Sequence, residues 1–219
     1  MHQVVQNLIK IKEEIRLNFS VSKDFKIPKI IAVSKTFGMD KILPLIEYGH
    51  LHFGENKVQE AIEKWGSIKS GTNNIKLHLI GGLQTNKVKL AVKLFDYIHS
   101  VDNEKLAKKI SDEQQKQKRK IKVFIQVNIG NEKQKFGVDK LSVTGLYSYC
   151  KALNLDVVGL MCIPPINQPS KIFFKEMSEM NKKFNFEELS MGMSSDYLDA
   201  IKNSATYVRI GSIIFGQRS

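Results

Sequence analysis

The 219-residue chain has few cysteines, no membrane-length apolar run and no dinucleotide-binding glycine motif, and each absence excludes a class of protein. Cys150 and Cys162 lack the spacing of metal ligands, which predicts small buried side chains in a reducing compartment. Charged residues interrupt the long apolar stretches, so the sequence predicts neither a secretory signal nor a transmembrane helix. We therefore expect a cytoplasmic protein with no membrane partner.

The chain is strongly basic, with a formal net charge of +12 at pH 7. Such a charge raises the question of nucleic-acid binding. However, only four of the 34 basic residues are arginines, and arginine forks are the usual readers of nucleic acids. The densest basic run, residues 105–120, also contains acidic residues and is typical of a solvated helix face. We therefore expect no nucleic-acid partner.

Short apolar segments alternate with amphipathic segments from one end of the chain to the other. The predicted strands span residues 29–33, 51–54, 76–80, 97–100, 122–128, 157–161, 186–191 and 207–210. The predicted helices span residues 40–48, 56–68, 86–94, 103–118, 140–153, 170–184 and 196–203, with a polar loop at 67–74. An apolar stripe from Val4 to Ile15 predicts one more helix before the first strand.

About eight β-α units in one run have two main solutions, a closed barrel and an open doubly wound sheet. The open sheet usually begins with a glycine-rich turn, and no G-x-G-x-x-G follows any predicted strand here. The sequence therefore predicts an α/β fold: a (β/α)8 TIM-like barrel in a single domain, residues 1–219, with an extra N-terminal helix. Functional residues of such barrels lie at the C-terminal ends of the strands.

The stretch after the last predicted strand has two features of an anion-binding site. Ser212 offers a hydroxyl and an N–H group where a helical turn begins, and N–H groups in that position bind phosphate. Gly211 allows close approach of a ligand, and Arg209, two residues earlier, faces the same side of the strand. The loop after the seventh strand carries Ser194, and a barrel would bring both loops together.

Lys35 follows the first predicted strand directly and is expected at the mouth of the barrel. Three interpretations remain open: a surface lysine, a charge partner for a phosphate, and an amine that forms a Schiff base with an aldehyde. The third interpretation requires a lowered pKa, which burial and a neighbouring cation such as Arg209 would promote.

Other polar residues near strand ends have less specific patterns. Glu55 and Asn56 follow the second strand and are candidates for contact with a ligand, although Asn56 is equally suited to cap a helix. His78 is expected to be a satisfied core histidine. His50 and His52 share a strand face but have no third ligand at useful spacing, so we expect no metal site. The long loop at 128–137 is expected to cover the mouth.

Six segments together resemble the pyridoxal phosphate homeostasis proteins, the YggS/PROSC family. They are AVSKT at 32–36, FGEN at 53–56, HLIGGLQTNK at 78–87, GLM at 159–161, SMGMS at 190–194 and VRIGS at 208–212. This family is similar to the N-terminal barrel of alanine racemase and lacks its second, β-rich domain. Gly130 departs from the pattern, since the family often has serine there, and this departure leaves the role of the loop open.

The resemblance implies a barrel that holds pyridoxal 5′-phosphate, the vitamin B6 cofactor. Lys35 matches the lysine that forms the Schiff base, Arg209 matches the arginine that faces the pyridine nitrogen, and Asn56 matches an asparagine near the cofactor. The phosphate-binding positions of the family match Ser194, Gly211 and Ser212. A guanidinium beside the ring nitrogen disfavours a second positive charge, which weakens the ring as an electron sink.

Three functions remain as hypotheses. The first is a monomeric carrier that holds pyridoxal phosphate reversibly on Lys35 for pyridoxal-phosphate homeostasis, delivers it to dependent apo-enzymes and lacks robust catalytic activity. The alternative is an amino-acid racemase-like enzyme, which needs acid/base groups on both faces of the cofactor adduct. The third is a cofactor-free isomerase of phosphorylated sugars, for which Glu55 is the one attractive carboxylate base.

Overall fold

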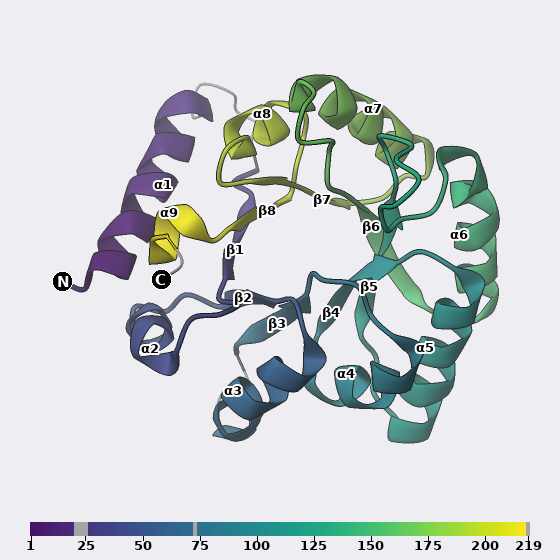
Figure 1. Cartoon of the computed structure of the whole chain (residues 1–219), viewed down its shortest axis with the longest axis horizontal. Coiled ribbons are helices and arrows are strands. Elements are labelled where there is room, and N and C mark those ends of the chain that lie inside the picture. Colours follow the sequence, from purple (N-terminus) through teal and green to yellow (C-terminus); the bar gives the residue numbers. More distant parts are fainter. Residues whose placement is uncertain (20–25, 72–73, 218–219) are drawn as a thin grey trace.

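The computed structural model describes residues 1–19, 26–71 and 74–217, which form a closed parallel barrel with the strands in sequence order (Figure 1). Its strands are β1 (Lys29–Val33), β2 (His52–Glu55), β3 (Lys76–Leu79), β4 (Tyr97–Val101), β5 (Lys122–Val127), β6 (Asp156–Cys162), β7 (Glu188–Met193) and β8 (Tyr207–Ile210). β1 pairs with β8 and closes the ring. The predicted (β/α)8 barrel is therefore confirmed.

The helices lie outside the ring of strands (Figure 1). They are α1 (Gln3–Phe19), α2 (Met39–Glu47), α3 (Val58–Gly71), α4 (Val88–Leu94), α5 (Glu104–Gln117), α6 (Val143–Ala152), α7 (Ser170–Lys183), α8 (Tyr197–Lys202) and α9 (Ser212–Phe215). Short 3-10 turns, η1 (Thr85–Lys87) and η2 (Lys140–Ser142), precede α4 and α6. Among the described residues, no helix combines the length and the apolar character needed to cross a membrane.

Local sequence signals explain most element ends. The side chain of Asn103 accepts a hydrogen bond from the backbone N–H of Leu106 at 2.9 Å and caps α5, which ends where Lys118 adopts a left-handed φ of 50°. β1 is a run of apolar residues after an initial lysine, and β5 has the same pattern apart from Gln126, as expected for strands covered on both faces.

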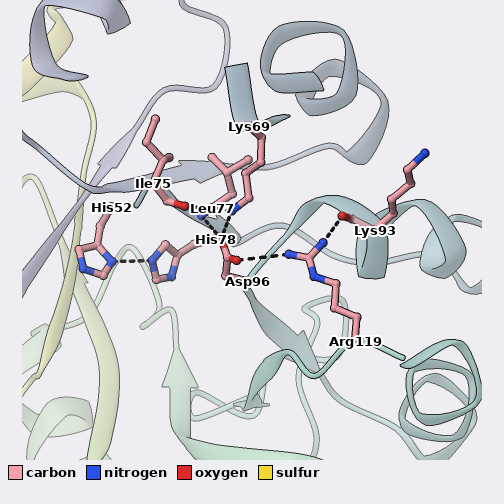
Figure 2. A network of polar contacts seen from close by, with 8 residues as sticks. All are labelled: His52, Lys69, Ile75, Leu77, His78, Lys93, Asp96 and Arg119. Carbon is pink, nitrogen blue, oxygen red and sulfur yellow. Dashed lines mark hydrogen bonds and ion pairs between the residues drawn. The ribbon is translucent and has the colours of Figure 1, made fainter. Parts of the chain in front are cut away.

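The predicted loop at 67–74 is wrong in its first part, because α3 continues to Gly71. Ile68 packs against the core, and the Lys69 ammonium donates to the backbone carbonyl of Ile75 at 2.9 Å. Lys69 also pairs with Asp96, which accepts a hydrogen bond from the Leu77 N–H at 2.8 Å (Figure 2). These tertiary contacts hold the last turn of the helix. Residues 72–73 of the predicted loop lie outside the described part of the chain.

Large side chains fill the part of the barrel interior that lies away from the C-terminal ends of the strands. Ile31, Tyr97, Phe124, Met161 and Tyr207 form a buried cluster inside the ring, separate from the larger core between strands and helices. This cluster runs from Tyr97 and Tyr207, at the starts of β4 and β8, to the middle of the barrel, and the free interior space lies at the C-terminal ends of the strands.

The two chain ends meet outside β1 and β8. α1 lies beside α9 (Figure 1), and the Asn7 side-chain amide donates to the backbone carbonyl of Ile214 at 3.0 Å. The predicted extra N-terminal helix is confirmed, and it supports the short turn that starts at Ser212.

The closest packing of two strands gives a test of the barrel. A Cβ added at Gly159 in β6 would lie 1.7 Å from the carbonyl oxygen of Glu188 in β7, so Gly159→Ala forces the strands apart. We expect it to lower the free energy of unfolding by about 3 kcal/mol, the upper part of the usual range for overpacking. Urea denaturation measures this change.

Gly66→Ala is the matched control, because a Cβ at this exposed position in α3 would meet none of the described atoms within 4 Å. It should raise the free energy of unfolding by roughly 0.5–1 kcal/mol through helix propensity. Equal effects of the two substitutions would contradict the tight contact between β6 and β7.

Candidate functional site

A cavity of about 560 Å³ opens at the C-terminal ends of the strands. Its wall comes from the loops that follow β1, β2, β3, β6, β7 and β8, together with residues of β5 and of the loop after it. All six residues predicted from the sequence line this cavity: Lys35, Asn56, Ser194, Arg209, Gly211 and Ser212. The fold thus gathers them from four strands, although their roles remain predictions.

Lys35 lies on the turn directly after β1, half-buried, with its side chain on the cavity wall. Thr36 has a φ of 68°, a left-handed conformation that is unusual for a β-branched residue. Strain of this kind persists only where neighbouring structure fixes the backbone, and it clusters at functional sites. The turn therefore presents Lys35 in a backbone conformation that is imposed by its surroundings.

Glu55, which was expected from the sequence as a candidate ligand contact and base, instead holds Ser34, the residue before Lys35. Its side chain is fully buried between β2 and α3, and one carboxylate oxygen accepts from Ser34 Oγ at 2.7 Å, Lys64 Nζ at 2.9 Å and Trp65 Nε1 at 2.9 Å. Lys64 also donates to the Ser34 carbonyl at 2.8 Å. Glu55 faces α3 because successive strand residues alternate sides. It anchors the residue before Lys35 and does not reach the cavity.

The loops after β7 and β8 meet at the far side of the cavity. Ser194 Oγ accepts a hydrogen bond from the Gly211 N–H at 3.4 Å. Within the turn of α9, the N–H groups of Ile214 and Phe215 both donate to the Gly211 carbonyl. The N–H groups of Ser212 and Ile213 therefore stand at the start of the helix, where backbone N–H groups have no acceptor within the helix itself. Gly211 also packs closely on β1, since a Cβ there would lie 3.3 Å from Val33 Cβ.

Arg209 reaches the floor of the cavity from β8 and is itself buried, with 4 % of its surface exposed. Its guanidinium donates to Ser190 Oγ at 2.7 Å and to the Cys162 carbonyl at 2.8 Å. Burial lowers the pKa of this guanidinium from its ordinary value, and Cys162 and Asp196 act in the opposite direction. The ordinary pKa of arginine is so high that the group stays charged near neutral pH.

The sequence analysis missed several apolar residues of the wall, among them Phe37, Ile80 and Ile163. It also missed Gln126, whose inward direction follows from its place in β5. The expectation that the loop at 128–137 covers the mouth is confirmed for Phe136, which lines the cavity and lies against Gly82.

The glycine at position 130 has a packing explanation. A Cβ there would lie 2.3 Å from Cγ of Pro165, so the loop after β5 rests directly on the loop after β6. The departure from the family pattern at this position therefore belongs to the contact between these two loops.

The chemistry of the cavity follows from its ionisable groups. Of the described residues that line it, Lys35 and Arg209 are the ones that carry charge, and both are cationic. The lining holds no carboxylate, histidine or tyrosine among the described residues. Together with the hydroxyls of Ser194 and Ser212, the cavity therefore suits an anionic ligand of small-molecule size.

Comparisons with known proteins first define the class. Residues 11–219 match the family model described as the N-terminal domain of alanine racemase. Within this class, the chain belongs to the pyridoxal phosphate homeostasis proteins, which confirms the resemblance seen in its motifs. A pyridoxal phosphate homeostasis protein of Aquifex aeolicus is 37% identical, and the match covers 87% of this chain and 87% of that protein.

Solved structures show the same relationship. PipY of Synechococcus elongatus, solved with pyridoxal phosphate bound, is 30% identical with a TM-score of 0.85, and the match covers 98% of this chain and 100% of that chain. Alanine racemase of Clostridium difficile shares the fold with a TM-score of 0.74 at 18% identity, and the match covers 99% of this chain but 57% of that one.

The anchoring role assigned to Glu55 can be tested by stability. Glu55→Gln removes the charge that compensates the buried ammonium of Lys64, whose side chain is 13% exposed. Breaking a buried ion pair on one side costs about 3 kcal/mol of unfolding free energy, which denaturant titration should detect.

Glu60→Gln is the matched control, since Glu60 of α3 pairs on the surface with Lys57, just before the helix, with 41% and 73% of the side chains exposed. An exposed pair contributes under about 1 kcal/mol. A Glu55 variant as stable as this control would contradict the anchoring role.

Proposed function

We propose that the cavity binds pyridoxal 5′-phosphate, that Lys35 holds its aldehyde as a reversible Schiff base, and that the chain acts in cellular pyridoxal-phosphate homeostasis. The observation that carries the proposal is that three complementary groups share one cavity. Lys35 supplies an amine for the aldehyde, Arg209 a cation for the ring nitrogen, and the meeting of the two last loops an anion cradle for the phosphate.

The fit of the phosphate rests on the loops after β7 and β8. Ser194 and Ser212 offer hydroxyls, and the first N–H groups of α9 point away from their own turn. A dianion placed there is neutralised in part by the two cationic side chains of the same wall. Asn56 at the opposite edge supplies an amide for a further polar contact in this proposal.

The arginine at the floor suits racemase-like chemistry at most, or simple storage, and the missing second acid/base group separates these two. A carboxylate at the ring nitrogen would stabilise its protonated form, whereas a guanidinium disfavours it and lowers the electron-withdrawing power of the ring. Racemisation also needs a second acid/base group opposite Lys35. The described residues of the wall offer no tyrosine, histidine or carboxylate for that role. We therefore propose a carrier without robust catalytic activity.

The same proposal covers how the carrier works. We propose one functional domain over residues 1–219, a monomer, and delivery of the cofactor to dependent apo-enzymes. We also propose a cytoplasmic location, because Cys150 and Cys162 are buried free thiols of the kind expected in a reducing compartment. Exchange of the bound aldehyde requires only that water or another amine reach Lys35, and the open cavity allows this.

Absorbance tests the proposed bond to Lys35. The purified chain mixed with pyridoxal phosphate should turn yellow, and borohydride should bleach the colour and fix the cofactor to the protein. Lys35→Ala should abolish the visible band because the amine is gone. A colourless wild-type protein, or a variant with the wild-type band, would contradict the proposal.

Isotope exchange separates the carrier from the racemase alternative. In deuterated water, the yellow protein should leave the α-proton of added amino acids in place, since the described residues of the wall include no second acid/base group. Alanine racemase is the positive control. Rapid α-proton exchange catalysed by this chain would establish the enzyme instead.

The role of Arg209 has its own spectral test. Arg209→Glu places a carboxylate at the ring nitrogen and should shift the absorbance of the bound cofactor by favouring ring protonation. Circular dichroism checks that the variant is folded. An unchanged spectrum in a folded variant would show that Arg209 does not face the nitrogen.

A further inference from the structure

Three histidines from successive strands form a line of hydrogen bonds through the barrel interior. His52 Nδ1 lies 2.9 Å from His78 Nε2, a contact that Figure 2 shows, and His78 Nδ1 lies 2.9 Å from His99 Nε2. His99 Nδ1 lies 3.0 Å from Ser190 Oγ, which accepts from Arg209 at 2.7 Å. The line therefore runs from His52, the first residue of β2, to the guanidinium of Arg209 on the cavity floor.

The guanidinium favours one direction for every hydrogen bond in this line. Arginine only donates, so Ser190 Oγ accepts from Arg209, and its hydroxyl proton is free to point at His99 Nδ1. His99 must then carry its proton on Nε2 and donate to His78 Nδ1. By the same reasoning His78 carries its proton on Nε2 and donates to His52 Nδ1. In this order all three imidazoles have the same tautomer, with the proton on Nε2.

Charge on the inner histidines would break this order. A second proton on His52 or His78 would set two N–H groups face to face across a 2.9 Å contact. Burial lowers the pKa of His52 to about 4 and holds the pKa values of His78 and His99 well below the ordinary range. The flat rings are also clamped by aromatic partners, since His78 stacks on Tyr97 and His99 on Phe124, each with centroids 4.3 Å apart.

The charged groups around the line act mostly in the same direction. Lysines from three elements and the guanidinium of β8 disfavour a further positive charge, and two carboxylates near His52 oppose them. The cations are Lys29, Lys69, Lys76 and Arg209, and the carboxylates are Asp96 and Glu188. The geometry of the hydrogen bonds and this surrounding charge both favour neutral imidazoles.

We propose that Ser190, His99, His78 and His52 are positioning residues that hold Arg209 toward the cavity through one directed chain of hydrogen bonds. Without Ser190 the guanidinium would keep the Cys162 carbonyl as its remaining described hydrogen-bond partner and would be free to turn about it. The part of this proposal in which Arg209 faces a cofactor ring rests on the proposed function. The chain of hydrogen bonds itself does not depend on that function.

The opposite order leaves a polar group unpaired. If His99 carried its proton on Nδ1, Ser190 Oγ would accept from two donors, and among the described residues no acceptor is placed for its own hydroxyl proton. Ser190 and His99 are fully buried, where an unpaired donor is costly. The directed chain satisfies each of these groups.

Nitrogen-15 NMR of the cofactor-free chain reads the order directly. The sequence contains five histidines, so each ring can be assigned by single substitution. At neutral pH we expect His52, His78 and His99 all to be neutral with the proton on Nε2. A charged ring among these three, or a proton on Nδ1 of His78 or His99, would overturn the proposal.

Paired serine variants test the link to Arg209. Ser190→Ala removes the hydroxyl that transmits the order, so mixed tautomers should appear at His99, and the dissociation constant for pyridoxal phosphate should rise roughly tenfold, as for one lost hydrogen bond to a charged group. Ser190→Thr keeps the hydroxyl and should preserve both properties. Ser100→Ala is the control: Ser100 is buried in β4, and its hydroxyl has no described hydrogen-bond partner.

The outcomes separate the two proposals. If wild-type tautomers persist in a folded Ser190→Ala variant, or if Ser100→Ala has the same effects, the positioning role is wrong. If the wild-type chain shows the expected tautomers but binds no pyridoxal phosphate, the proposed function fails and the directed chain stands.

Discussion

The pairing of β1 with β8 is the constraint on which the site depends. It sets Ile31 beside Arg209 and Ala32 beside Ile210, so the turn that carries Lys35 lies next to the turn that starts at Ser212. Groups from opposite ends of the sequence become neighbours only because the sheet closes. The close packing of Gly211 against Val33 shows how little separates the two strand exits.

Closure of the barrel also determines which chemical groups line the cavity. Two cations, three serine hydroxyls and two amides share its wall, while the carboxylate of Glu55 is buried on the side of β2 that faces α3. Its charge is used to fix the residue before Lys35 and to compensate the ammonium of Lys64. The barrel thus separates the buried ion pair of Glu55 and Lys64, on the outer side of β2, from the two cationic side chains that line the cavity.

Much of this arrangement was predictable from sequence. The alternation of strands and helices gave the barrel, and the rule that functional residues follow the strands gave Lys35, Ser194, Arg209 and Ser212 as neighbours. The direction of Glu55 was missed because the end of a strand is uncertain by a residue, and one residue reverses the face.

Other features depend on contacts that no local pattern contains. The end of α3 is held by the pairing of Lys69 with Asp96, which is distant in sequence. The line of histidines depends on the stagger of neighbouring strands, which places His52, His78 and His99 at successive heights. His78 was expected only as a satisfied core residue, which its two hydrogen bonds confirm, and its partners came from other strands.

The central claim is that one particular amine among the many lysines of this chain binds the cofactor. Borohydride reduction of the loaded protein, followed by peptide mapping with mass spectrometry, tests it most directly. The account predicts that the reduced cofactor is found on the peptide that contains Lys35, in about one copy per chain. Modification spread over surface lysines, or concentrated on a lysine outside the cavity, would contradict it.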